Sequence, residues 1–147
     1  MIENLLTEAL REKIAEAVKD FRLPVEYGEM RAPNVINGYL SPRDYTRKDV
    51  FPFVLVRAEE GSINVDKTQT TVAIIIGCYS NENDGEKYCL NVMRRIIQAL
   101  SEMENGILAN KYVLKHPMSW QIAEQPVNKW QLDMMTQWEY NTPQAIF

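Results

Sequence analysis

The sequence predicts an α+β domain, in which a mainly antiparallel β-sheet carries two helices on one face. Two long stretches repeat apolar residues at helical spacing, and several shorter stretches are rich in β-branched and aromatic residues. The predicted order is helix, strand, strand, helix, strand, strand, strand, which is typical of an α+β layer structure. A chain of 147 residues suits one domain and can bury a core without disulfides or metal.

The first helix is predicted from apolar residues that recur every three or four positions over residues 2–21, with Glu and Lys between them. It should end before Leu23-Pro24, because the residue that precedes a proline is disfavoured in the α region. Residues 25–50 contain several Gly and Pro, and we predict a long loop excursion with room for one short strand. Long loops in small domains are often functional, and an ordinary surface loop fits this composition equally well.

A hairpin is predicted after this excursion. Residues 53–57 and 70–79 are mostly apolar, whereas the residues between them are mainly polar and include Glu59-Glu60-Gly61. We therefore expect two strands joined by a long tip. A second helix should follow the acidic loop 80–85, where Asn83 and Glu86 fit a capping box with Asn in place of Ser or Thr.

The second half of the chain is predicted to hold this helix and three strands. His116-Pro117 is predicted as a turn between two short strands, at residues 112–114 and 120–122. The helix and the last strand have regular apolar patterns. On the helix these residues are Cys89, Leu90, Met93, Ile96, Ile97 and Leu100, and on one face of the strand they are Leu132, Met134, Thr136, Trp138 and Tyr140.

The most apolar stretch, TTVAIIIGCYS at residues 70–80, could present a nucleophile or simply form a core strand. A catalytic thiol at Cys78 needs a base within reach or a lowered pKa. The only histidine is His116, which the sequence places in a turn. A core thiol is the better interpretation for Cys78, and also for Cys89 on the apolar stripe of the second helix.

The same stretch has apolar residues on both faces, since Ile74 and Ile76 alternate with Ala73 and Ile75. A sheet with helices on one face only should show polar residues at alternate positions. Either the C-terminal strands fold over the second face or another subunit covers it. The sequence leaves both alternatives open.

Composition and motifs argue against several classes of function. The chain has 16 basic and 20 acidic residues, a net charge of −4, which argues against coating nucleic acid. The longest apolar run, residues 72–76, is too short to span a membrane, and residues 1–4 do not begin a signal peptide. We expect a soluble protein with free thiols in a reducing compartment. Phosphate-loop, hydrolase and zinc motifs are lacking, and loop 80–85 lacks the Glu that a calcium loop requires, so no catalytic residue, metal or cofactor is predicted.

Several segments in succession resemble one family. FPFVLVRAEEG, TTVAIIIGCYS, YCLNVMRRIIQAL, YVLKHPMSWQI and MMTQWEY follow one another from Phe51 to Tyr140. This succession is similar to the small tail proteins of long-tailed bacteriophages and prophages, in particular the tail terminator (tail completion) group. The likeness lies in the order of the segments rather than in any single motif, and residues 25–50 have no counterpart in it.

The resemblance implies a structural protein with an α+β fold and neither active site nor cofactor. Members of this group form a ring, usually a hexamer, on the end of the tail tube, where the ring stops polymerisation and offers a docking surface to the head. The implied partners are further copies of the chain, the tail-tube protein and the head–tail connector protein. Neither a membrane nor a specific nucleic-acid sequence is implied. The implied location is the virion tail, after synthesis in the bacterial host cytoplasm.

Three segments are the expected contacts in such an assembly: residues 41–49, the hairpin tip 59–67 and the C-terminal tail 141–147. Each could instead be surface without a role. The candidate interface residues are Arg43, Asp44, Tyr45, Arg47, Lys48, Glu59, Glu60, Asp66, Lys67, Ile146 and Phe147.

Two alternatives to the terminator remain. A head–tail joining (head-closure) protein would bind the portal or connector rather than the tail tube. A small thiol-dependent or small-molecule-binding enzyme would lose its activity in Cys78→Ser while keeping its fold.

Overall fold

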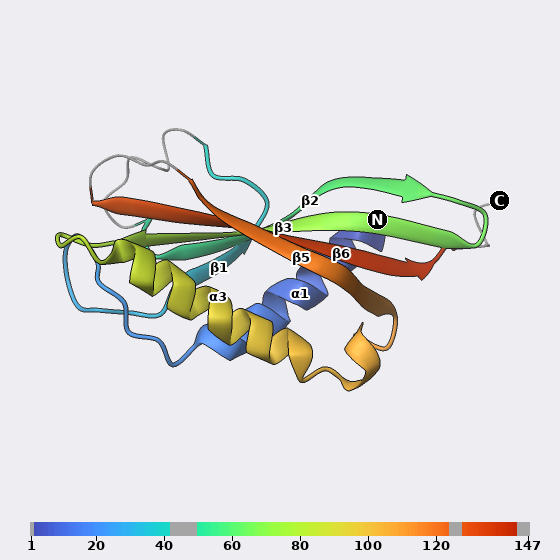
Figure 1. Cartoon of the computed structure of the whole chain (residues 1–147), viewed down its shortest axis with the longest axis horizontal. Coiled ribbons are helices and arrows are strands. Elements are labelled where there is room, and N and C mark those ends of the chain that lie inside the picture. Colours follow the sequence, from blue (N-terminus) through green and yellow to red (C-terminus); the bar gives the residue numbers. More distant parts are fainter. Residues whose placement is uncertain (1, 42–49, 124–127, 144–147) are drawn as a thin grey trace.

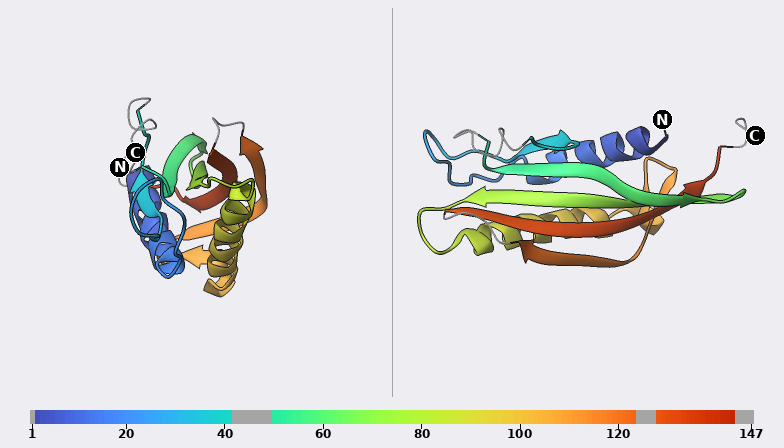
Figure 2. Two further views of the ribbon diagram at one scale, coloured as in Figure 1. Left: turned by 90° about the vertical axis from the view of Figure 1, so that its left-hand side faces the viewer. Right: turned by 90° about the horizontal axis from the view of Figure 1, so that it is seen from above.

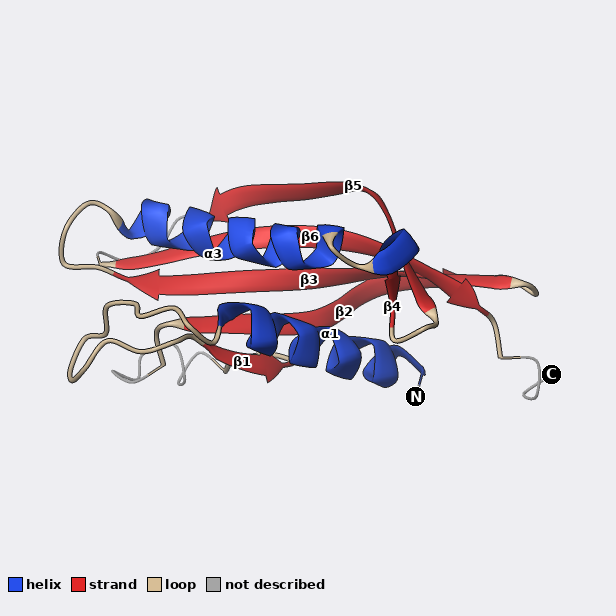
Figure 3. Ribbon diagram, turned by 90° about the horizontal axis from the view of Figure 1, so that it is seen from below, coloured by secondary structure: helices blue, strands red, loops and turns tan. Residues whose placement is uncertain are grey.

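The computed structural model describes residues 2–41, 50–123 and 128–143, with side chains from Leu5 onward. It confirms the predicted class, because helices α1 and α3 both lie on one face of a mainly antiparallel sheet (Figures 1 and 3). The elements in chain order are α1 (Ile2–Val18), β1 (Asn34–Asn37), β2 (Phe53–Ile63), β3 (Lys67–Tyr79), α3 (Gly85–Ser101), the 3-10 turn η1 (Glu104–Gly106), β4 (Ile107–Leu108), β5 (Tyr112–Ala123) and β6 (Lys129–Asn141).

The strands form one six-stranded sheet in the order β1-β2-β3-β6-β5-β4. Neighbours are antiparallel, except that β1 runs parallel to β2. Strands β3 and β6 pair along their whole length, from Lys67↔Asn141 to Tyr79↔Lys129, and form the centre of the sheet. Seen along its long axis the sheet is strongly curved, with α1 and α3 side by side on the same side of it (Figure 2).

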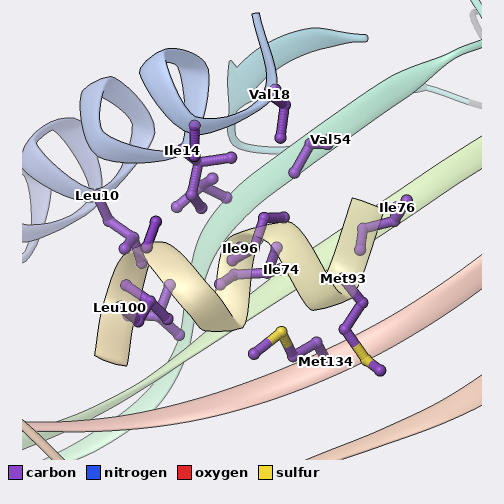
Figure 4. Packing of buried hydrophobic residues seen from close by; sticks show 14 of the residues in the cluster. Leu10, Ile14, Val18, Val54, Ile74, Ile76, Met93, Ile96, Leu100 and Met134 are labelled. Carbon is purple, nitrogen blue, oxygen red and sulfur yellow. The ribbon is translucent and has the colours of Figure 1, made fainter. Parts of the chain in front are cut away.

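The main core lies between the helices and the sheet. The predicted alternation in the last strand is confirmed, because Leu132, Met134, Thr136, Trp138 and Tyr140 are all buried. Both helices contribute apolar residues that meet Ile74 and Ile76 of β3 (Figure 4). Those of the helices include Leu10, Ile14 and Val18 on α1 and Met93, Ile96 and Leu100 on α3.

The predicted long hairpin tip is wrong, because the two strands continue through it. Strand β2 reaches Ile63 and β3 begins at Lys67, and the Asn64 N–H donates to the Lys67 carbonyl at 2.9 Å to close the turn. The residues between 58 and 69 are mostly polar, so their composition is that of a loop. Their backbone groups are nevertheless paired across the ladder, which is what holds an exposed strand in place.

The strands after the second helix also need correction. Residues 112–123 form one strand, β5, rather than two with a turn between them, and the irregularity at His116-Pro117 is a register shift between Lys115 and Ser119. Proline is tolerated there because a bulge leaves its nitrogen outside the ladder. Strand β4 is added to the predicted order, whereas β1 is the one short strand for which the excursion 25–50 left room.

The capping box is also wrong, because α3 begins at Gly85 with Asp84 as its N-cap. The Ser80 hydroxyl donates to the Asp84 carboxylate and accepts from the Glu82 N–H at 3.1 Å, so this loop is held by Ser80. The Trp130 ring lies against the start of the helix, where a Cβ on Gly85 would come within 1.9 Å of the ring. Glycine is therefore required here by close approach.

The chain itself buries the apolar part of the second sheet face. Phe53, Leu55, Ala73 and Ile75 are at most 2% exposed in the single chain. The residues described around them belong to the segment before β2, to β1 and the residues after it, to the end of β3 and to the middle of β6: Val50, Phe51, Ile36, Leu40, Tyr79 and Met135. Burial of this patch thus depends neither on C-terminal strands folded over it nor on another subunit, which were the two predicted alternatives.

Candidate assembly surface

The end of the sheet that carries the β2–β3 turn extends past the first turn of α1 (Figure 1). We call this end the distal ribbon, defined as residues 57–71 of β2 and β3 together with residues 137–141 of β6. Residues 59–67 are exposed to solvent throughout. The ribbon is therefore a regular, paired structure that projects from the core.

On the second face, the distal ribbon carries a ladder of polar side chains. The Thr71 hydroxyl donates to the Gln137 amide oxygen at 2.7 Å, and the Gln69 amide donates to the Glu139 carboxylate at 3.1 Å. The Lys67 ammonium donates to the Asn141 side-chain oxygen at 2.7 Å. Cross-strand pairs of this kind each add a few tenths of a kcal/mol, about 0.2–1, and fix the register of the strands.

On the helical face, the ribbon and the residues next to it bury hydroxyl groups instead of aliphatic side chains. Thr70 Oγ1 and the Tyr140 hydroxyl lie 2.9 Å apart, as do Thr68 Oγ1 and Thr142 Oγ1. The buried Thr136 hydroxyl donates to the Val72 carbonyl at 2.9 Å and accepts from the Trp138 indole N–H at 2.8 Å. Buried polar groups are costly unless they are paired, and these hydroxyls are paired.

Sequence reasoning missed this network. Its only signal was the placement of Thr68, Thr70 and Thr136 on positions that the strand alternation assigns to the buried face. Threonine is common in exposed strands as well, so position alone does not identify a buried network.

Glu59 is the extra residue of a β-bulge, because the register with β3 shifts between Ala58 and Glu60. Its carboxylate lies 2.9 Å from the Arg57 guanidinium, which in turn sits 4.2 Å from the centre of the Tyr39 ring. The bulge thus brings an ion pair and an aromatic ring together where β1 stops covering β2.

The structure places four of the predicted interface residues together on the distal ribbon: Glu59, Glu60, Asp66 and Lys67. Arg43, Asp44, Tyr45, Arg47, Lys48, Ile146 and Phe147 lie outside the described residues. Two apolar side chains at the turn were not singled out from the sequence. Ile63 is 65% exposed and Val65 is 78% exposed.

The thiols lie on the helical side of the sheet, and both are buried. A hydrogen bond with Cys89, together with burial, raises the pKa of the Cys78 thiol well above its ordinary range. Cys78 pairs with Trp130, whereas His116 lies between Lys115, which pairs with Gln137, and Ser119, which pairs with Met135. His116 is therefore about six residues away along the strands, roughly 20 Å. The structure therefore does not bring the thiol and the histidine together.

Two hollows on the surface are smaller than typical small-molecule sites. One, of about 250 Å³, lies along residues 58–63 and 68–70 of the hairpin, and the other, of about 240 Å³, lies between the end of α3 and β5 beside His116. Ligand pockets usually measure about 300–1,000 Å³. Among the described residues, no three His, Cys, Asp or Glu side chains gather as metal ligands would.

In comparisons with known proteins, no family model and no curated protein matches the chain. Within the described ranges, neither helix has the length and apolar character needed to cross a bilayer.

Proposed function

We propose that the chain is a structural tail protein of a bacteriophage or prophage, a ring-forming tail terminator that caps the tail tube and provides the head-joining surface. The observation that carries this proposal is the distal ribbon. A projecting β-ribbon contributes little apolar burial of its own, and isolated ribbons are marginal in water. Here hydrogen bonds of the buried hydroxyl network and of the ladder to β6 join the strands of the ribbon on both faces, while Ile63 and Val65 remain exposed at its end.

A paired ribbon with apolar residues at its end suits contact with another protein, because removing exposed apolar groups from water is favourable. The mild acidity of the chain suits a ring through which DNA passes, since like charge does not retain phosphates. The apolar second face lends no support to assembly, because the single chain already buries it.

The test is co-sedimentation with tail tubes from the phage or prophage that encodes the chain, prepared without their terminator. The chain should sediment with the tubes and appear by electron microscopy as a ring at one end. Binding to the portal or connector but not to tubes would favour the head-closure alternative. Binding to neither would contradict both.

A pair of variants connects this test to the ribbon. Changing Ile63 and Val65 together to Ser should weaken tube binding roughly ten-fold, as expected when a central apolar contact is lost. Met30→Ser is the matched control, because Met30 is also an exposed apolar side chain but lies in the loop before β1. Equal binding by the ribbon variant and the wild type would mean that the ribbon is not the contact.

A further inference from the structure

The hollow between the end of α3 and β5 brings together one imidazole and two thioethers. We call it the α3–β5 hollow, and its volume is about 240 Å³. Met103 lines it from the segment after α3, and His116 and Met118 line it from β5. These three residues are distant in the sequence on one side and two positions apart on the other, so the fold gathers them at one place.

Strand β5 presents His116 and Met118 at the point where its ladder with β6 is interrupted. Lys115 pairs with Gln137 and Ser119 pairs with Met135, so residues 116–118 lie opposite a single residue of β6. Extra residues of this kind bend a strand and redirect its side chains, and such bulges are frequent beside functional sites. The interruption therefore accounts for the way β5 supplies two donors to one hollow.

Met103 is fixed by its backbone. Its N–H donates to the Leu100 carbonyl at 3.3 Å, and its carbonyl accepts from the Gly106 N–H at 3.1 Å. Met103 and Met118 are partly buried and pack against the main core, whereas His116 is exposed. The thioethers thus belong to the sheltered part of the hollow, and the imidazole belongs to the part that solvent reaches.

The rest of the described lining offers little to a hard cation. Its only side-chain oxygen is the Ser101 hydroxyl, which already donates to the Gln98 carbonyl at 2.8 Å. Calcium and magnesium ions take carboxylate, carbonyl and water oxygens as ligands. Zinc takes thiolates, imidazoles and carboxylates, and the described lining supplies one imidazole of that set.

The donors that are present suit a soft metal ion. Thioethers and thiolates select Cu(I), and imidazole is a common ligand of copper. The hollow is smaller than the roughly 300–1,000 Å³ of typical organic-ligand pockets, whereas a single ion needs no more room than a water molecule, about 30 Å³. Size and donor type therefore favour the same class of occupant.

We propose that Met103, His116 and Met118 form a binding site for one soft monovalent metal ion of the Cu(I) and Ag(I) class. The ligands are the two thioether sulfur atoms and one imidazole nitrogen. Binding changes the oxidation state of neither the ion nor the protein. The inference does not depend on the proposed function, because it concerns a different surface and a different class of ligand.

NMR of the methionine methyl groups tests the site directly. The full-length chain is labelled with ¹³C at its methionine methyl groups and titrated with silver nitrate, since Ag(I) needs no reductant. The signals of Met103 and Met118 should shift and saturate at one ion per chain. Met30 is the control, because its exposed side chain lies in the loop before β1, and its signal should stay in place. Signals of Met103 and Met118 that do not move in excess Ag(I) would overturn the proposal.

Met118→Leu removes one ligand while nearly keeping the size and apolar character of the side chain, so the fold should survive. Loss of an outer-shell partner alone typically weakens metal binding about 10- to 100-fold, so loss of this direct ligand should weaken Ag(I) binding at least roughly ten-fold. Isothermal titration calorimetry measures the affinity. Met30→Leu is the matched control and should bind as the wild type does. Equal affinities of the two variants would overturn the proposal.

The buried thiols are the competing soft ligands in this chain. In the double variant Cys78→Ala with Cys89→Ala, Ag(I) should still shift the signals of Met103 and Met118. Binding that disappears in this double variant but is unchanged in Met118→Leu would place the ion on the thiols and overturn the proposal. The Met118→Leu comparison is made in the wild-type background, so it remains decisive even if the thiol variant does not fold.

Discussion

The second face of the sheet has two ends that differ in chemistry although the same three strands run through both. Near the start of β2 it buries Phe53, Leu55 and Ile75. Toward the β2–β3 turn it carries the ladder of Gln69, Thr71, Gln137 and Glu139. One end adds to the core and the other faces solvent. We call the buried end, near the start of β2, the anchored end, and the end at the β2–β3 turn the projecting end. The two ends should respond differently to substitution.

Phe53→Ala tests the anchored end and should give the largest effect. The ring is fully buried and lies 4.8 Å from the Phe51 ring, so its removal leaves a cavity. The free energy of unfolding should fall by about 3–5 kcal/mol, measured by urea denaturation. Ile63→Ala at the projecting end is the control and should change it by less than about 0.5 kcal/mol. Equal losses at the two sites would contradict the division of the face.

The anchored end was easier to predict from the sequence than the projecting end. Runs such as VAIII identify a buried strand whatever its partners are. The polar ladder at the projecting end depends on the β3–β6 register, which brings Gln137 and Glu139 beside Thr71 and Gln69. These residues are far apart in the sequence, so no local pattern predicts their pairing. Glu59, Glu60, Asp66 and Lys67 were singled out because their polar stretch is visible locally, although the long tip predicted there is wrong, and their role as contacts stays a prediction. The hydroxyl network follows only from the assembled sheet.

Gly77→Ala tests how closely the anchored end is packed. A Cβ at this position would lie 2.3 Å from the Phe53 ring and 2.9 Å from the Phe51 ring. Overpacking of this kind should lower the free energy of unfolding by about 1–3 kcal/mol in denaturant titrations. In the double variant with Phe53→Leu the loss should be smaller than the sum of the two single losses, because the smaller side chain makes room. Strict additivity would mean that the ring is not what excludes the methyl group.

Thr136→Val tests the buried hydroxyl network on the helical face, next to the projecting end. The substitution keeps the shape of the side chain but leaves the Trp138 indole N–H and the Val72 carbonyl without this partner. Leaving buried polar groups unsatisfied should cost about 1–3 kcal/mol in thermal or urea unfolding. Thr71→Val is the matched control on the opposite face, where water can replace the Gln137 contact, and should cost less than about 0.5 kcal/mol.

The smallest expected effect concerns the Cys78 thiol at the anchored end. Because the hydrogen bond with Cys89 and burial raise its pKa in the folded chain, the unfolded chain loses its proton first as the pH rises. The stabilisation is therefore complete below the ordinary thiol pKa, about 8.5, and decreases above it. Urea denaturation at pH 7 and at pH 9.5 should show a decrease in stability that is smaller in Cys78→Ala. The native thiol should also resist iodoacetamide at pH 7, and rapid alkylation of Cys78 in the folded chain would revive the thiol-dependent alternative.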